Sequence, residues 1–306
     1  MSTLDGHGSL QGLPFMPEML QYCGKRFRIY KSAHKTCDTI TDAHSLRRME
    51  DAVHLDMLRC DGAAHGGCQA GCLFFWKKAW LKPVKRQDSG TDFAKPTIIE
   101  LTANAQTRSL SNSVEGDTTG GAITEERYSC QATELLRATT PLKWWHVRPY
   151  ILDLISRNIR IRDFIRSVAI AGYNIVMRLH WRGRPYPDVR GHARGKTPTT
   201  NLNLQPGELI EVRSKEEILQ TIDEKQRNRG LWFDVEMTPY CGRRHRVLRR
   251  VDRIINEKTG LMMRLPSDCL ILEGVTCGGL YSKDRLFCPR SIYPYWREVW
   301  LKRVPS

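Results

Sequence analysis

The order of polar and apolar positions predicts short strands near both ends of the chain. Residues 26–30 and 244–248 alternate in polarity, and residues 52–58 and 270–275 do the same. Side chains of a strand point to opposite faces in turn, so this alternation indicates strands with one buried face. Short strands joined by turns within about eighty residues are typical of a small β-barrel of the Src-homology-three type.

The middle of the chain has a different pattern. Residues 85–127 are rich in Ser, Thr, Gly and Asp and predict a flexible linker. Between residues 149 and 177 the apolar positions recur at helical spacing. Further along, Ser214 and Glu217 have the spacing of a capping box, which predicts the start of a short helix.

Two pairs of strings indicate that one module occurs twice. Residues 12–26 align without gaps with residues 230–244 and are identical at nine of fifteen positions. Residues 76–82 match residues 296–302 in the same order along the chain. Two such anchors indicate an internal duplication. The alternating stretch 206–214 has no counterpart in the first copy, so the first module is predicted either to lack its opening strand or to begin further upstream.

These patterns together predict the architecture. We expect an α+β fold that is mainly β, with two repeated small β-barrel modules joined by a linker and a helical segment. The predicted boundaries are 1–84 for the first cysteine-rich module, 85–127 for the flexible linker, 128–200 for the basic helical segment and 201–306 for the second cysteine-rich module.

Composition narrows the function classes. The chain has 306 residues, 41% hydrophobic residues and a formal net charge of +15. An unbroken apolar run of about 18 residues is absent, so no transmembrane helix is expected. Residues 1–12 lack the layout of a secretory signal. We therefore expect a cytoplasmic protein whose ten cysteines serve as metal ligands or thiols rather than as disulfides.

The cysteines cluster in each module in a pattern that predicts a metal site. The stretch from Cys60 to Cys72 contains several glycines, which allow the backbone to fold tightly enough for thiolates to meet. Three of the four cysteines chosen in each module align between the two copies. The predicted ligands are Cys23, Cys60, Cys68 and Cys72 in the first module and Cys241, Cys269, Cys277 and Cys288 in the second.

Four sulfur ligands suit tetrahedral zinc, and an iron–sulfur cluster is the alternative cofactor. A closed set of four sulfurs leaves no position open for a substrate, which favours a structural site. Two questions stay open at this point. His65 or Cys37 can replace one of the predicted ligands, and the whole set can instead consist of buried small residues.

Cys130 lies outside both modules and is the candidate catalytic residue. The residues after it predict a helix, and a helix N-terminus favours the thiolate form of a cysteine. His146, beside two tryptophans, is the candidate base. Glu18 and Glu236 stand at equal places of the two copies, where their carboxylates can accept hydrogen bonds from metal ligands or can bind backbone amides in a turn, and we expect the turn role.

Basic residues gather in the helical segment. Residues 156–196 contain ten Lys or Arg and only two acids. Such a patch attracts phosphate backbones or other anionic partners. The interleaving of aromatic and basic residues that is typical of single-strand binding does not accompany it. A protein partner or an acidic ligand is therefore favoured over nucleic acid, and no membrane partner is expected.

Several strings resemble those of an uncharacterised family of two-module, cysteine-rich bacterial proteins. They are residues 15–19 with 22–24, residues 65–72 and residues 286–298. The resemblance spans both modules and the helical middle. It implies no catalytic residues.

The leading hypothesis is a cytoplasmic metal-binding protein, with zinc as the metal, that acts as an accessory or binding protein in a bacterial biosynthetic pathway. One alternative is an iron–sulfur or thiol-dependent enzyme that uses a cluster or Cys130. Another is a nucleic-acid-binding protein that uses the basic helical segment.

Overall fold

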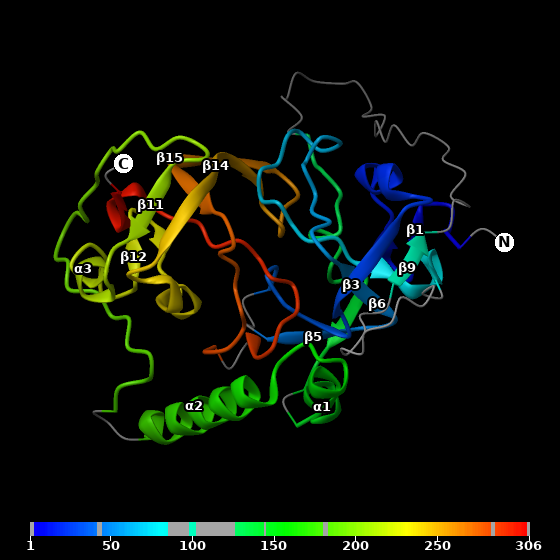
Figure 1. Cartoon of the computed structure of the whole chain (residues 1–306), viewed down its shortest axis with the longest axis horizontal. Helices are drawn as coiled ribbons and strands as arrows, with labels where there is room; N and C mark the ends of the chain where they lie inside the picture. Colours follow the sequence, from blue (N-terminus) through cyan, green and yellow to red (C-terminus); the bar gives the residue numbers. More distant parts are fainter. Residues whose placement is uncertain are drawn as a thin grey trace, which may run out of the picture.

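The computed structural model describes residues 3–41, 45–84, 98–101, 126–143, 145–179, 183–282 and 285–304 (Figure 1). The chain has an α+β fold that is mainly β, as predicted, with several small sheets and few helices. Figure 1 shows two halves side by side, the first half up to residue 143 and the second half from residue 183. The helices α1 (Arg148–Ile155) and α2 (Ile161–Leu179) lie along one edge.

The first half contains a five-stranded sheet and a three-stranded sheet. The larger sheet has the order β7 (Trp76–Lys77), β6 (Ala52–Leu55), β3 (Arg26–Ser32), β9 (Ile98–Leu101) and β8 (Leu81–Pro83). The smaller sheet has the order β10 (Thr139–Pro141), β5 (Leu46–Met49) and β4 (Lys35–Cys37). A short hairpin of β1 (Ser9–Leu10) and β2 (Leu13–Pro14) precedes the 3₁₀ helix η1 (Pro17–Tyr22), and η2 (Lys78–Trp80) precedes β8.

The second half contains a four-stranded sheet in the order β15 (Met262–Leu272), β14 (Arg244–Ile255), β11 (Leu209–Val212) and β16 (Leu301–Arg303). The hairpin of β12 (Arg227–Asn228) and β13 (Leu231–Trp232) precedes the 3₁₀ helix η3 (Val235–Tyr240), and η5 (Glu298–Trp300) precedes β16. Helix α3 (Lys215–Leu219) follows β11, and its capping box is confirmed. The Ser214 Oγ accepts the Glu217 N–H at 3.2 Å, and the Glu217 carboxylate accepts the Ser214 N–H at 2.9 Å.

The two halves share the register of their central strands. Ile29 pairs with Leu55 in the first half, as Val247 pairs with Leu272 in the second, and a register shift follows both pairs. Further along, Cys37 pairs with Leu46, and in the second half Ile255 pairs with Met262. In the first half this ladder is formed by four short strands, β3 to β6. In the second half two long strands, β14 and β15, form it with a second register shift between Val251 and Arg253.

Strand β9 lies where the opening strand of the first half is expected. It pairs with β3 on one side and β8 on the other, as β11 pairs with β14 and β16. Glu100 lies opposite Arg26 and Lys82, and Glu211 lies opposite Arg244 and Lys302. Residues 98–101 fall inside the segment predicted to be a linker. Four residues give too short an alternation to be recognised in polar surroundings.

Each half buries its own aromatic core. Trp76, Trp80 and Phe75 are buried in the first, and Trp296, Trp300 and Phe233 are buried in the second. The ring centroids of Phe15 and Trp80 lie 5.2 Å apart, and those of Phe233 and Trp300 lie 5.3 Å apart. Both contacts are edge-to-face, the arrangement that aromatic quadrupoles favour. The matching strings of the sequence therefore supply matching parts of the two cores.

The two halves exchange loops. The loop that contains Cys60, Cys68 and Cys72 reaches β14, where the Ile255 N–H donates to the Cys68 sulfur at 3.4 Å and the Gln69 N–H donates to a backbone oxygen at 3.1 Å. The loop of residues 277–292 reaches β4 in return, because the Cys37 N–H donates to the Cys288 sulfur at 3.1 Å. Each cysteine loop is therefore packed against a strand of the other half.

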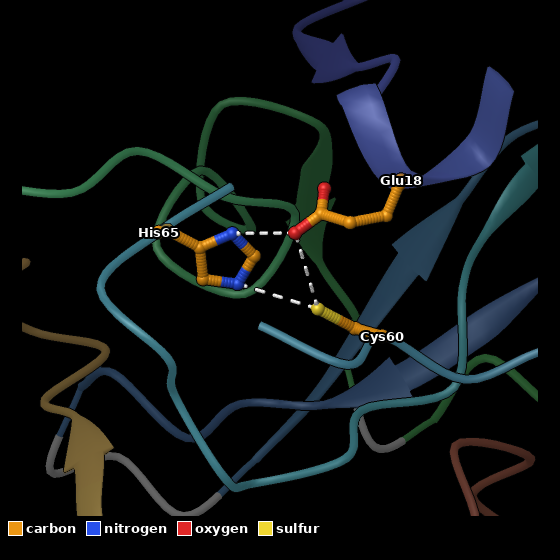
Figure 2. A group of neighbouring side chains, drawn as sticks. All are labelled: Glu18, Cys60 and His65. Carbon is orange, nitrogen blue, oxygen red and sulfur yellow. Dashed lines mark hydrogen bonds and ion pairs between the residues drawn. The ribbon is translucent and has the colours of Figure 1, made fainter. Parts of the chain in front are cut away.

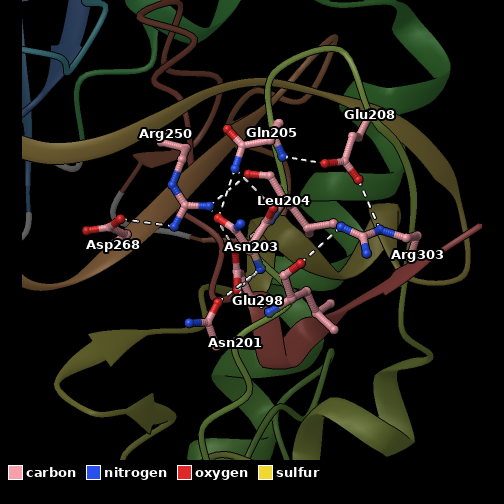
Figure 3. Close-up of polar contacts among 10 residues, drawn as sticks. Asn201, Asn203, Leu204, Gln205, Glu208, Arg250, Asp268, Glu298 and Arg303 are labelled. Carbon is pink, nitrogen blue, oxygen red and sulfur yellow. Dashed lines mark hydrogen bonds and ion pairs between the residues drawn. The ribbon is translucent and has the colours of Figure 1, made fainter.

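The buried carboxylate of Glu298 holds residues 202–204, which lead into the second half (Figure 3). Glu298 accepts the backbone N–H groups of residues 202–204 at 2.5, 3.1 and 3.0 Å. The Arg250 guanidinium donates to Glu298 at 2.9 Å and to the Leu204 oxygen at 2.7 Å. Burial alone would raise the pKa of Glu298, but these hydrogen bonds lower it below its usual value.

The predicted helical spacing between residues 149 and 177 corresponds to α1 and α2. Pro149 lies in the first turn of α1, where its missing N–H leaves no hydrogen bond unmade. None of the helices in the described part of the chain combines the length and the apolar character needed to cross a bilayer.

Candidate metal centre

Glu18, Cys60 and His65 meet beneath η1 (Figure 2). The His65 Nδ1 lies 3.0 Å from the Glu18 Oε1, and the His65 Nε2 lies 3.3 Å from the Cys60 Sγ. The Cys60 Sγ and the Glu18 Oε1 are 3.9 Å apart. Glu18 and His65 are buried, and Cys60 is half-buried. A carboxylate, an imidazole and a thiol can bind a metal ion in this arrangement.

Local backbone structure explains why these side chains converge. Glu18 lies in the first turn of η1, directly after Pro17. Gly62 has a φ of +78°, and a Cβ there would lie 2.1 Å from the Cys68 carbonyl oxygen, so only glycine fits this turn. The Ala64 N–H donates to the Glu18 Oε1 at 3.0 Å, as expected for a carboxylate that binds backbone amides. This contact places the neighbouring His65 ring beside Glu18.

The site lies on the wall of an enclosed cavity of about 40 Å³. Three further cysteines, Cys68, Cys72 and Cys130, line the same cavity as Cys60 and His65. The second half contributes Ile255, Glu257 and Arg290 to the wall, because the two halves exchange loops here. Four thiols and an imidazole therefore surround one small space.

Burial keeps three of these thiols, those of Cys60, Cys72 and Cys130, protonated in the absence of a cation. It raises the pKa of Cys60 well above its ordinary value, and the charge of Glu18 adds to the effect. Burial also raises the pKa of Cys72 to about 12 and raises the pKa of Cys130. Burial would raise the pKa of Glu18 too, but its hydrogen bonds to His65 and to backbone amides lower it. A bound cation would supply the charge that these thiols need in order to lose their protons.

The equivalent place in the second half is filled differently. Glu236 accepts the N–H groups of Leu280, Tyr281 and Ser282 at 2.9, 2.6 and 2.9 Å. Residues 278–287 contain no histidine. Cys277 lies nearby, and burial raises its pKa to about 12. In the part of the chain that the structure describes, only Glu18, Cys60 and His65 bring three such ligand atoms within 4.8 Å of one another.

Cys37 and Cys288 form a buried pair between the two halves. The hydrogen bond between their side chains raises the pKa of Cys37. Burial would raise the pKa of Cys288 as well, but the bonds from Cys37 and from the Arg290 backbone lower it. The buried Arg290 lies close to this pair.

The structure groups the predicted ligands in a new way. Cys60, Cys68 and Cys72 line one cavity, and their fourth companion there is Cys130, whereas Cys23 does not line it. In the second half, Cys269 packs against Val251 and Ile271. Cys241 packs at the margin of the second aromatic core. The assignment of the eight cysteines as ligands stays a prediction.

The sequence did not identify Glu18 as a metal ligand, and it placed Cys130 in different surroundings. Glu18 and Glu236 are identical in the two copies, and this identity was the available signal for a shared role. Cys130 does not precede a helix, since residues 131–137 form turns, and its Sγ lies in the cavity region rather than at a helix dipole. Burial raises the pKa of Cys130, whereas an activated cysteine nucleophile has a lowered pKa.

No protein-family model, curated protein or solved structure matches the chain. The geometry of the described residues is therefore the basis for assigning a function.

Proposed function

We propose that the protein binds a transition-metal ion, zinc, through Cys60 and His65 at the cysteine-lined cavity. The observation that carries this proposal is that the Glu18 carboxylate, the Cys60 thiol and the His65 imidazole bring three ligand atoms within 4.8 Å of one another. The Glu18 Oε1 and the Cys60 Sγ lie only 3.9 Å apart, so both face the same edge of the imidazole. A carboxylate oxygen, an imidazole nitrogen and a thiolate are all ligands that zinc accepts.

The chemistry of the donors favours zinc among the common metals. Thiolate and imidazole are soft and borderline ligands, whereas magnesium and calcium prefer oxygen. Cys68, Cys72 and Cys130 line the same space and are the candidates for the remaining positions. A site built mainly from sulfur and closed by both halves would hold the two cysteine loops together, which is a structural role.

The wider parts of the proposal rest on the sequence. We infer that the two halves are copies of a Src-homology-three-like barrel and that the protein serves as a cytoplasmic accessory or binding protein in a bacterial biosynthetic pathway. The shared register of the central strands supports the first inference. The resemblance to two-module bacterial proteins supports the second.

A thiol-dependent enzyme is the second candidate, with Cys60 rather than Cys130 as its nucleophile. A carboxylate, an imidazole and a thiol in contact, at 3.0 and 3.3 Å, are also the groups of a catalytic triad, although here the carboxylate oxygen lies 3.9 Å from the sulfur and not across the ring. Burial argues against it, because the pKa of Cys60 is raised well above the physiological range. A metal ion would instead displace the thiol proton on binding.

Metal analysis of the protein, purified without chelators, tests the proposal. We expect about one zinc ion per chain at this site, with its loss and a lower Tm in Cys60→Ser and His65→Ala. Glu18→Gln should weaken zinc affinity about tenfold to a hundredfold because it removes the carboxylate charge beside Cys60 and His65. Cys23→Ser is the matched control, since Cys23 does not line the cavity and the variant should keep its metal.

Two outcomes would contradict zinc binding. One is a wild-type protein that contains no zinc and takes up none in competition with a chromophoric chelator. The other is zinc that remains at full occupancy in the double variant Cys60→Ser with His65→Ala. Rapid alkylation of Cys60 by iodoacetamide near neutral pH, in metal-free and folded protein, would favour the thiol enzyme instead.

A further inference from the structure

Helix α2 exposes an apolar stripe along its whole length. Ile161, Ile165, Ile175 and Leu179 are 61%, 61%, 57% and 82% exposed, and Val168 is also exposed. With Gly172, these positions follow one another at spacings of four, three, four, three and four residues. This alternation is the heptad pattern of a helix that packs along another helix. A soluble protein rarely leaves so continuous an apolar surface uncovered.

The opposite side of α2 fixes the helix to the protein. Ser167 is buried, and the Asn174 side chain bonds the backbone of Tyr186 at 2.8 and 2.6 Å. Phe164 stacks on Phe287 with ring centroids 5.0 Å apart. The helix is therefore held by the side that carries Ser167, Asn174 and Phe164, together with the half-buried Ile170 and Met177, while the residues of the stripe are exposed. Figure 1 shows α2 at the edge of the molecule.

Gly172 adds a second observation in the middle of the stripe. A Cβ built at this residue would meet no heavy atom within 4 Å, so no packing inside the described chain requires a glycine there. Glycine in a helix interior costs about 1 kcal/mol relative to alanine. Its absent side chain leaves room for the backbone of another helix to approach closely.

Charge identifies the kind of partner. In the heptad, Arg162 and Arg178 occupy positions that flank the stripe, and Arg160 precedes the helix. Asp163 is the only acid within α2. A second copy would bring another basic helix, from a chain that also has a net charge of +15, against this one. Glutamate or aspartate at the flanking positions of a partner helix would instead pair with Arg162 and Arg178.

The composition of the exposed apolar residues favours a helix over a lipid surface. Helices that lie in the membrane interface carry Trp, Phe or Leu on their apolar face. The exposed apolar residues of α2, which also include Tyr173 and Val176, are mainly Ile and Val, and the one phenylalanine of the helix, Phe164, packs against Phe287. β-branched residues at heptad positions are typical of two-stranded coiled coils.

We propose that the apolar stripe of α2 is a docking surface for an amphipathic helix of a partner protein with acidic residues at its flanking positions. This inference is independent of the metal site. The contact would be a two-helix seam between α2 and the partner, with one arginine–carboxylate pair on each side, at Arg162 and at Arg178.

A synthetic peptide of three heptads tests this docking surface. The peptide carries Ile and Leu at the seam positions, Glu at the flanking positions and a fluorescent label. We expect the full-length protein to bind it saturably in the micromolar range by fluorescence anisotropy. Ile165→Gln with Ile175→Gln should weaken binding at least about tenfold, because buried apolar surface is lost. Met57→Gln, at an exposed methionine outside α2, is the matched control and should bind as the wild type does.

Charge reversal provides the second arm of the test. The variant Arg162→Glu with Arg178→Glu should lose the acidic peptide and gain a peptide with Lys at the flanking positions. Circular dichroism verifies that each variant is folded. Absence of saturable binding, or equal binding of the two peptides by the wild type, would overturn the proposal. So would stripe-dependent binding to phosphatidylserine vesicles without peptide binding, or a dimer in sedimentation equilibrium that Ile165→Gln abolishes.

Discussion

The two halves of the chain share a strand frame and differ in what occupies equivalent positions. His54 pairs with Lys31 in the first half, at the place where Ile271 pairs with Arg249 in the second. The Cys60 N–H bonds the Cys72 oxygen at 2.8 Å, and the same bond in the second half runs from Cys277 to Ile292 at 2.8 Å. Backbone pairing is thus compatible with polar side chains in one copy and aliphatic side chains in the other.

The glutamates of η1 and η3 show the functional side of this difference. Both are buried at the same place of their halves, yet Glu18 contacts His65 and Glu236 accepts three backbone N–H groups. The loops account for it, because Cys60 and Cys68 are eight positions apart and Cys277 and Cys288 are eleven apart. The longer loop covers the carboxylate with its own amides, and the shorter loop presents an imidazole. Loop length therefore decides whether the shared carboxylate contacts an imidazole or only backbone amides.

The largest expected effect tests the equivalence of β9 and β11. Ile99→Pro and Ile210→Pro should each destabilise their own half by more than about 2 kcal/mol, because proline removes a donor and does not fit a strand paired on both sides. Both losses can be measured by urea unfolding, with hydrogen exchange to assign each loss to its half. Ile99→Val and Ile210→Val, which keep the backbone donor, are the controls. An Ile99→Pro variant as stable as the wild type would show that residues 98–101 do not serve as the counterpart of β11.

An intermediate effect tests the polar core of the first half. Burial lowers the pKa of His54 to about 3, while its Nδ1 bonds the Phe74 oxygen at 2.9 Å. Because the folded pKa lies below the unfolded one, this stability is fully present above about pH 6.5 and is lost as the pH falls toward 3. Between pH 7 and pH 5 the wild type should lose about 2 kcal/mol that His54→Gln does not lose. Urea unfolding at both pH values measures the difference, and parallel pH profiles for the two proteins would contradict a neutral buried imidazole.

The smallest expected effect concerns the helix that follows β11. Ser214→Ala removes the side-chain acceptor for the Glu217 N–H and should cost about 1 kcal/mol. Ser214→Asp keeps an acceptor and should retain most of that stability. Thermal unfolding of the two variants beside the wild type gives the comparison. Equal losses in both would mean that the cap does not stabilise the second half.

Local patterns in the sequence were sufficient for a large part of the fold. Alternation predicted the strands around Ile29 and Val247. The matching strings predicted equivalent segments in both halves, and these form η1 and η3 and the tryptophan-containing η2 and η5. The capping box at Ser214 was also evident, because it depends on two residues three positions apart. These features follow from contacts between near neighbours along the chain, whose spacing the sequence displays directly.

Tertiary structure alone decided which distant segments meet. The place of β9, the entry of Cys130 into the cavity, the contact between Cys37 and Cys288, and the outward direction of the α2 stripe all depend on packing between segments far apart in the chain. The sequence does not distinguish a cysteine that lines a cavity from one that is packed in a core. Periodicity indicates that a helix has an apolar face, but the attachment through Asn174 and Phe164 determines that this face points to solvent.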